Sequence, residues 1–456
     1  MRSPKFVTGS TLRHMLVMTT TSTVGLLAVF AVDLTNIFFL SLLGEVEAPS
    51  AVGYASAITF FTLSVCIGLS IAASALVSQA LGAGGTRRAR RHVVNVAALS
   101  LLISVPLTVA VLLSQPMLLR LLGADGRTFD LALSYLNILV PSTPLMALAM
   151  VAAGVVRALG DARRSMYATL LGGFANAVLD PILIFGLNLG VDGAAIASVL
   201  ARVVTLLYSG YVVVRGHALI TRFGWRAFTP ELRPMLAIAL PAIFTNIATP
   251  IGQAYVTGAM ARFGDEAVAG LAIISRLVPV TFAGLFAMSG AIGPIIGQNF
   301  GARRFDRVSG SLRESLLVAA GYTLLVSLVL LAGRGLIVDA FNAEGAAADL
   351  LTFYCTWIAV FFFFNGASFV TNAAFNNLGY AYLATGFNFG KATVGTVPFV
   401  LAGAALYGAP GVLIGQAAGG LVFGVAGIGA AFWLTGRLAG RAAAVPDLSG
   451  ACEGRR

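Results

Sequence analysis

Two acidic residues stand within long apolar stretches of the sequence, where carboxylates are rarely found. Asp33 lies 11 residues before Gly44, and Asp180 lies 10 residues before Gly190, and each glycine marks the end of an apolar stretch. In a helix that rises 1.5 Å per residue, both carboxylates would lie roughly 15 Å from the same end. An aspartate at that depth in a membrane costs about 2.5–3.5 kcal/mol, so its default interpretation is functional.

Three further polar side chains are expected in the same layer. Asn176 lies four residues before Asp180 and therefore on the same helix face. Ser198 and Tyr135 lie at a comparable depth in two other apolar stretches. Together these groups could take up a proton, or bind Na⁺ through Asp33, Asn176 and Asp180. The alternative is that the two carboxylates form only the hydrogen bonds that fix helix packing.

Pro181 follows Asp180 directly and is expected to act as a helix hinge. Proline has no backbone N–H, so it cannot donate a hydrogen bond to the carbonyl of Ala177. A bend at this point would leave that carbonyl oxygen free beside the carboxylate, where it could bind a cation.

Three basic residues also lie inside apolar stretches: Arg202, Arg276 and Lys391. Arg202 could neutralise the nearby carboxylates, hydrogen-bond a backbone carbonyl, or extend its charge toward the membrane surface. Arg276 has the same alternatives. We expect Lys391 to line a cavity in the second half of the chain, together with Gln253, which matches Asp33 in the repeat described below.

These groups need membrane-spanning helices to hold them. Hydrophobic residues make up 58% of the 456 residues and charged ones 10%, with a mean hydropathy of +0.91. Soluble domains carry roughly 25% charged residues, so lipid must be the solvent here. A span needs about 20 apolar residues, and the sequence predicts an all-α integral membrane protein with twelve transmembrane helices. The expected spans are roughly 12–43, 50–80, 93–121, 128–158, 163–188, 192–214, 232–262, 266–298, 310–338, 346–376, 381–406 and 410–437.

The basic residues predict the orientation of these spans. With the N-terminus in the cytoplasm, most of the 29 Lys and Arg fall in cytoplasmic segments, whereas the opposite loops hold Arg120, Arg127, Arg262 and Arg334. This asymmetry follows the positive-inside rule, and it accounts for the net charge of +11 without a nucleic-acid partner. We expect a multi-pass protein of the cytoplasmic (inner) membrane with both termini in the cytoplasm.

The sequence repeats itself at a separation of 219 residues. Gln79-Ala-Leu-Gly82 matches Gln298-Asn-Phe-Gly301, and Arg157-Ala-Leu-Gly160 matches Asn376-Asn-Leu-Gly379. Because each half has an even number of spans, the two six-helix bundles are related by a pseudo-twofold axis along the membrane normal. The expected divisions are an N-lobe (1–214), a cytoplasmic linker (215–233), a C-lobe (234–437) and a cytoplasmic tail (438–456).

The sequence offers little for metal or covalent chemistry. Its three cysteines lie far apart, and its three histidines lie near the ends of apolar stretches. Neither a nucleophile with its base nor a set of metal ligands accompanies Asp33. We therefore expect neither an enzyme nor a cofactor other than a coupling ion.

The pattern as a whole resembles the multidrug and toxic compound extrusion (MATE) family of cation-coupled antiporters, over nearly the whole chain. The resemblance implies that Asp33, Asn176, Asp180 and Ser198 form the cation site of the N-lobe, with Ser198 in place of a frequent threonine; Tyr135 is a weaker match. It rests on Val32-Asp33, the Gln79–Gly82 turn and its repeat, Arg157-Ala-Leu-Gly160-Asp161, and Asn176-x-x-x-Asp180-Pro181 followed by Gly193-Ala-Ala-Ile-Ala-Ser198.

The resemblance also implies a function. It predicts two bundles in a V and a monomeric secondary active transporter that exports lipophilic or cationic drugs by antiport with H⁺ or Na⁺ through alternating access. The second half has no acid at the positions that match Asp33 and Asp180, which is similar to the branch that couples through its N-lobe carboxylates. The alternative is a flippase for a lipid-linked saccharide of the same superfamily. Only Lys391 and Arg276 could form its cationic cavity, and the carboxylates disfavour an anionic cargo.

Overall fold

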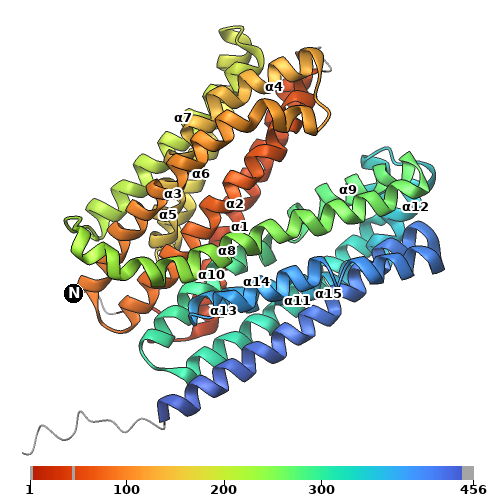
Figure 1. The fold of residues 1–456 in the computed structure, drawn as a ribbon. Coiled ribbons are helices and arrows are strands. Elements are labelled where there is room, and N and C mark those ends of the chain that lie inside the picture. Colours follow the sequence, from red (N-terminus) through yellow and green to blue (C-terminus); the bar gives the residue numbers. More distant parts are fainter. Residues whose placement is uncertain (1–3, 44–46, 444–456) are drawn as a thin grey trace, which may run out of the picture.

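The computed structural model describes residues 4–43 and 47–443, which form helices and turns and no strand (Figure 1). The first half contains α1 (Thr11–Ser41), α2 (Glu47–Gly82), α3 (Thr86–Leu121), α4 (Gly126–Leu139), α5 (Thr143–Ala158), α6 (Ala162–Pro181) and α7 (Gly190–Tyr211). The second half contains α8 (Trp225–Met260), α9 (Asp265–Thr281), α10 (Ala283–Gly301), α11 (Phe305–Ala340), α12 (Gly345–Phe353), α13 (Phe363–Asn377), α14 (Ala381–Ala392) and α15 (Val397–Ala443). Short 3₁₀ and π-helical turns join several of them into longer spans.

The described residues contain ten helices long and apolar enough to cross a membrane, or eleven when α9 and α10, bent by 49°, count as one span. One of them, Ala381–Ala443, has 63 residues. At 1.5 Å per residue it would extend about 95 Å, roughly three times the hydrocarbon core of a bilayer. The number of membrane spans therefore depends on whether this helix is broken.

The break lies at Gly408, whose φ of 64° and ψ of −142° reverse the chain. The two arms then run antiparallel, because a Cβ on Gly403 would lie 2.0 Å from the Gly411 carbonyl oxygen. Farther along, a Cβ on Gly419 would lie 1.5 Å from the Gly395 carbonyl oxygen. Only glycine permits so close a backbone approach. The hairpin adds one span, so the expected fold with twelve transmembrane helices is confirmed.

The two halves form two bundles that meet at one end and diverge at the other, in the shape of a V (Figure 1). The irregular segment between them covers only residues 217–224, because α8 begins at Trp225, inside the segment expected as linker. α15 continues to Ala443. The rest of the expected tail, 444–456, lies outside the described residues, as does Gly44 at the end of the first expected span.

The repeated Gln-x-x-Gly turns meet where the two bundles join. We call this end the arginine-rich end, because it carries Arg87, Arg88, Arg303 and Arg304. A Cβ on Gly82 of α2 would lie 2.0 Å from the Gln298 carbonyl oxygen, and one on Gly301 of α10 would lie 2.1 Å from the Gln79 carbonyl oxygen. The two turns therefore pack backbone to backbone, each needing the other's glycine.

The glutamine side chains of these turns cross between the bundles. Gln79 Nε2 donates to the carbonyl of Asn377, and Gln298 Nε2 donates to the carbonyl of Ala158, each at 2.8 Å. The two carbonyls are 219 residues apart, the same separation as the two glutamines. The hydrogen bonds thus obey the pseudo-twofold symmetry and close the arginine-rich end.

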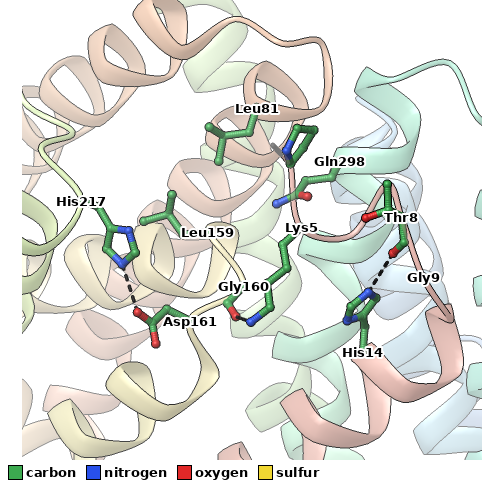
Figure 2. A pocket seen from close by; sticks show the side chains of 11 residues that line it. Lys5, Thr8, Gly9, His14, Leu81, Leu159, Gly160, Asp161, His217 and Gln298 are labelled. Atoms are coloured by element: carbon green, nitrogen blue, oxygen red, sulfur yellow. Dashed lines mark hydrogen bonds and ion pairs between the residues drawn. The ribbon is translucent and has the colours of Figure 1, made fainter. Parts of the chain in front are cut away.

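Residues 4–9, here called the N-terminal strap, cross the same seam. Phe6 is 1% exposed, and its backbone N–H donates to Gln298 Oε1 of the second half at 2.9 Å. Lys5 donates from Nζ to the Gly160 carbonyl of the first half at 2.7 Å (Figure 2). The strap therefore contacts both bundles at the arginine-rich end.

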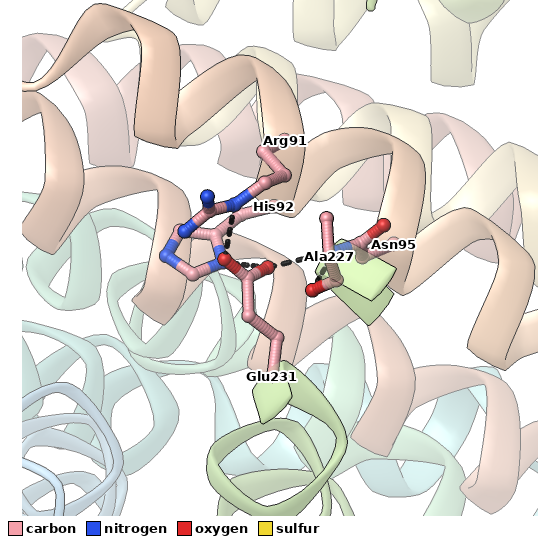
Figure 3. Close-up of polar contacts among 5 residues, drawn as sticks. All are labelled: Arg91, His92, Asn95, Ala227 and Glu231. Carbon is pink, nitrogen blue, oxygen red and sulfur yellow. Dashed lines mark hydrogen bonds and ion pairs between the residues drawn. The ribbon is translucent and has the colours of Figure 1, made fainter. Parts of the chain in front are cut away.

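A polar cluster attaches the start of α8 to α3 of the first half (Figure 3). The Glu231 carboxylate accepts from Arg91 Nε, and from Asn95 Nδ2 at 2.8 Å, while His92 Nδ1 lies 3.1 Å from it. Asn95 Nδ2 also lies 3.4 Å from the Ala227 carbonyl. Because Glu231 is buried, several partners are needed to offset the loss of its hydration. The cluster fixes where the second half begins.

Candidate functional site

Asp180 lies at the end of α6, where the helix changes its winding. Pro181 ends α6, and the π-helical turn Ile182–Gly186 follows it directly. A proline at this point leaves the carbonyl one turn earlier without its usual donor. π-helical turns often accompany functional sites. The expected hinge at Pro181 therefore coincides with an irregular backbone.

The Asp180 carboxylate is completely buried and only half paired. Its Oδ2 accepts a hydrogen bond from Asn176 Nδ2 at 2.8 Å, across one turn of α6. Its Oδ1 has no hydrogen-bond partner among the described residues. A buried polar atom without a partner costs about 1–3 kcal/mol, and more when it is charged. This oxygen is therefore free to accept a proton or to bind a cation.

Tyr135 lies at the centre of the residues that the sequence singled out. Its hydroxyl lies near Ser198 and close enough to both Asp33 and Asp180 to interact electrostatically with their carboxylates. Asn176 joins the same group through Asp180. The structure thus brings together four helices of the first half: α1, α4, α6 and α7.

Asp33 differs from Asp180 in its surroundings. It lies on α1 next to Val32, which packs at Gly173 of α6, but its own side chain is exposed. Among the described residues its carboxylate forms no hydrogen bond or ion pair. The two carboxylates therefore share one region without touching: one is enclosed in the bundle and the other is accessible.

Arg202 does not pair with either carboxylate in this structure. Its Nη1 donates to the Leu139 carbonyl at 3.2 Å and to Ser142 Oγ at 2.7 Å, where α4 meets the 3₁₀ turn Val140–Ser142. Of the expected alternatives, hydrogen bonding to a backbone carbonyl is the one observed. Arg202 stabilises the break between α4 and α5 beside the site.

Asn36 is a polar residue of this region that the sequence did not lead us to expect. It lies one turn after Asp33 on α1, and its Oδ1 is buried without a hydrogen-bond partner in the described part of the chain. The only sequence signal is an amide three residues after an acid within an apolar stretch. This oxygen is a second unsatisfied acceptor in the layer of Asp33.

The composition of the site limits its chemistry. Over residues 4–43 and 47–443, no group of three or more His, Cys, Asp or Glu side chains could hold a metal ion. Two carboxylates with amide and hydroxyl neighbours suit a proton or a monovalent cation, because hard cations prefer oxygen ligands.

Gln253 and Lys391, expected to line a cavity of the second half, both line one of about 370 Å³. The cavity lies among α8, α9, α13, α14 and α15. Lys391 Nζ donates to Asn365 Oδ1 within it. Arg276 is exposed and does not belong to the described lining. The two groups suggested for a cationic cavity are therefore separated.

A larger cavity of about 800 Å³ lies at the arginine-rich end beside the N-terminal strap (Figure 2). Its charged groups have partners. His217 Nε2 lies 3.0 Å from Asp161 Oδ2, and Arg164 Nη1 lies 3.4 Å from the same oxygen. Lys5 donates to a backbone carbonyl. These contacts suit a closed seam rather than a ligand site.

Two inclined bundles of six spans, with a buried acidic site in one and a cavity in the other, are the architecture of a membrane transporter. Comparison with known families agrees with this class. The chain belongs to the MatE family, whose model matches residues 22–182 and 241–420. The expected family is thereby confirmed.

Several characterised proteins are similar along most of their length. The FAD transporter of Shewanella oneidensis is 27% identical over 348 residues, covering 75% of this chain and 77% of that protein. The multidrug export protein MepA of Staphylococcus haemolyticus is 25% identical, covering 83% and 84%. A solved outward-facing conformation of a multidrug resistance MATE family transporter of the MOP superfamily superposes with a TM-score of 0.90 at 23% identity, covering 96% and 99%.

Proposed function

We propose that this protein is a secondary active efflux transporter that exports small lipophilic compounds by antiport with H⁺ or Na⁺ through alternating access. The observation that carries the proposal is the Asp180 carboxylate, completely buried and with Oδ1 unpaired, in the same region as Asp33. We further propose that the protein is a monomer of the cytoplasmic (inner) membrane. The arginine-rich end and both termini then face the cytoplasm, because basic residues are retained on that side.

The coupling follows from the electrostatics of the site. With the bundles apart at the end away from the cytoplasm, a proton or Na⁺ reaches Asp33 and Asp180 from outside. Neutralising a buried carboxylate removes its desolvation cost, so the loaded state favours a different packing of α6 around Pro181. That packing expels the cargo outward and favours the return of the inward-facing state. Coupling requires that the ion and the cargo each bind the two states with different affinity.

The two coupling ions make different demands on the site. A proton needs only the unpaired Asp180 Oδ1 or the accessible Asp33 carboxylate. Na⁺ needs several oxygens, which Asp33, Asp180, the Asn176 amide and the Asn36 amide supply. Ser198 and Tyr135 hydroxyls complete a polar layer around either ion.

The acidic character of this region supports organic cations as cargo. A cation competes with the coupling ion for the same negative charge, which is the simplest way to link their binding. The similarity to a multidrug export protein agrees with a broad substrate range. A flippase for a lipid-linked saccharide is less well supported, because Arg276 does not join Lys391 in the cavity of the second half.

Reconstituted efflux of a fluorescent cationic dye tests this function. Proteoliposomes are energised in turn by a pH gradient and by a Na⁺ gradient, and the gradient that drives efflux identifies the ion. Asp33→Asn and Asp180→Asn should each reduce efflux to the background of protein-free liposomes. Asp130→Asn, at an exposed position of α4, is the matched control and should transport normally. Normal efflux in both site variants would contradict the proposal.

A further inference from the structure

The cavity of the second half is lined by one basic side chain, Lys391, and its described lining has no acidic side chain. Lys391 lies in its wall near the end of α14, and among the described residues its ammonium donates only to the neutral Asn365 Oδ1. No Asp or Glu belongs to the described lining, and no ion pair of Lys391 occurs in the described part of the chain. An ammonium has three N–H donors, so two remain for a ligand.

A hydroxyl in the same wall is also unsatisfied. Tyr354 is 5% exposed and lines the cavity, and its hydroxyl has no hydrogen-bond partner within residues 4–43 and 47–443. It begins the π-helical turn Tyr354–Ile358, an irregularity that often accompanies function. Buried tyrosine hydroxyls usually have partners. Tyr354 and Lys391 thus line the same cavity, and the buried hydroxyl in its wall has no protein partner in the described structure.

The backbone is irregular at the same place. α14 ends at Ala392 and α15 begins at Val397, so residues 393–396 interrupt a spanning helix directly after Lys391. Thr396 lines the cavity and donates from Oγ1 to the Lys391 carbonyl at 2.8 Å. Broken helices at membrane depth are tolerated where they line cavities, and in transporters they mark binding sites.

The remaining walls are aromatic and amide-bearing. Phe286 and Phe369 form a tilted pair with ring centroids 4.9 Å apart, and Phe362 lies 6.1 Å from Phe286. Gln253 and Gln416 also line the cavity, and Gln416 Nε2 lies 3.4 Å from Gln253 Oε1. Aromatic rings favour flat aromatic ligands. A volume of about 370 Å³ is at the small end for ligand cavities and suits one fused ring system.

We propose that this cavity binds small aromatic monoanions, with the anionic group on the Lys391 ammonium and the Tyr354 hydroxyl and the ring among the phenylalanines. The proposal rests on the proposed efflux function and extends its cargo to a class of the opposite charge. The acidic site and this cavity lie in different bundles, so the N-lobe carboxylates do not oppose the anion at close range.

Equilibrium binding to the purified full-length protein tests the proposal without any ion gradient. The probes are 2-naphthoate and 2-naphthamide, which share a ring system and differ in charge. Titration calorimetry in detergent should show naphthoate binding about tenfold or more tighter, as expected for a charge-assisted hydrogen bond. Equal binding of the two probes, or no naphthoate binding, would overturn the proposal without any mutant.

Three variants locate the site. Lys391→Met keeps the length of the side chain without its charge and should weaken naphthoate about tenfold while leaving naphthamide unchanged. Lys391→Arg should restore the preference for naphthoate. Tyr354→Phe removes a hydroxyl that has no protein partner, so it should not impair folding, and it should weaken naphthoate about threefold. Native naphthoate affinity in both Lys391→Met and Tyr354→Phe would overturn the proposal.

The outcome separates this proposal from the function on which it rests. Asp180→Asn should abolish gradient-driven dye efflux and leave naphthoate affinity unchanged, because Asp180 lies in the other bundle. If the native protein binds naphthoate selectively but exports no dye under either gradient, the proposed efflux function fails and the binding site stands. If it exports dye but does not distinguish the two probes, only the anion site fails.

Discussion

Single residues carry the chemical contrast between the two bundles. Asp180 Oδ1 and the Tyr354 hydroxyl are buried atoms without partners in the described structure, one at the acidic site and the other on a residue that lines the cavity of Lys391. Interiors rarely leave such atoms unpaired, because each costs free energy. Because one lies at each polar site, in opposite halves, we propose both as ligand positions.

The sequence predicts only part of this arrangement. The contact between Asn176 and Asp180 follows from a spacing of four residues on one helix, so it could be predicted. The unpaired states of Asn36 and Tyr354 depend on which side chains neighbouring helices bring near them. No spacing within one helix records that information, and these two residues were not expected as site residues.

At the same scale, we expect Asp180→Asn to stabilise the purified protein in detergent. The amide has nearly the same shape but no charge. The free-energy cost of burying an incompletely paired carboxylate is therefore removed. The expected gain in the free energy of unfolding is about 1 kcal/mol at about pH 8. It should shrink at about pH 5, where protonation neutralises the native carboxyl group as well. Thermal unfolding at both pH values measures the difference.

Asp192→Asn is the matched control for this measurement. Asp192 Oδ1 accepts a hydrogen bond from Ser134 Oγ at 2.7 Å, so its replacement should bring no comparable gain. If the Asp180→Asn protein is less stable than the native protein at both pH values, the buried Asp180 charge does not carry the expected free-energy cost.

Helices and their ends explain how the bundles can close. The spans could be predicted because each requires a long apolar stretch between polar turns, although α3 and α8 begin seven residues before the expected 93 and 232. Their breaks could not, because proline alone does not decide them. α8 contains Pro230, Pro234, Pro241 and Pro250 and remains one helix, whereas α9 and α10 separate at Phe282. Packing against other elements decides which prolines bend a helix.

At the scale of helix ends, we expect Gly82→Val and Gly301→Val to force the arginine-rich end open. A side chain at either position would overlap the backbone of the other bundle. The distance between spin labels at Arg88→Cys and Arg303→Cys, in a protein whose native cysteines are replaced, should increase in both variants. Dye efflux should fall strongly, because the transporter can no longer adopt the conformation in which the arginine-rich end is closed.

Gly310→Val is the control for these glycine variants. Gly310 lies within α11, and a Cβ there would meet nothing within 4 Å. It should leave both the label distance and the efflux unchanged. An unchanged distance in Gly82→Val and Gly301→Val would show that the two turns do not hold the seam.

The whole molecule is symmetric in its scaffold and asymmetric in its polar sites. Repeated turns at a separation of 219 residues predicted two related halves, and the reciprocal hydrogen bonds of Gln79 and Gln298 follow that symmetry. The sequence could not predict at which end the two bundles meet and at which end they diverge. Open and closed forms use the same helices, and they differ in contacts between halves that local patterns do not specify.

Orientation is a prediction at this scale. We expect Arg303→Cys, at the arginine-rich end, to be protected from a membrane-impermeant thiol reagent in intact cells and labelled after permeabilisation. Gly123→Cys, at the turn after α3, should be labelled in intact cells, because it lies at the opposite end of the spans. The reverse pattern would place the termini outside and would contradict the positive-inside assignment.

The N-terminal strap has a consequence for how this protein can evolve. Its backbone carbonyls at Phe6 and Gly9 accept from Arg307 Nη2 at 3.0 and 2.9 Å, and the Val7 carbonyl accepts from Arg304 Nη1 at 3.3 Å. Main-chain groups are the same in every residue, so most strap positions can drift in sequence without losing these bonds. Selection should act mainly on Lys5, whose Nζ donates to the Gly160 carbonyl, on Phe6, whose ring is buried, and on Gly9, whose φ of 72° disfavours other residues. Homologues could therefore keep the same seal with strap sequences that no longer resemble one another.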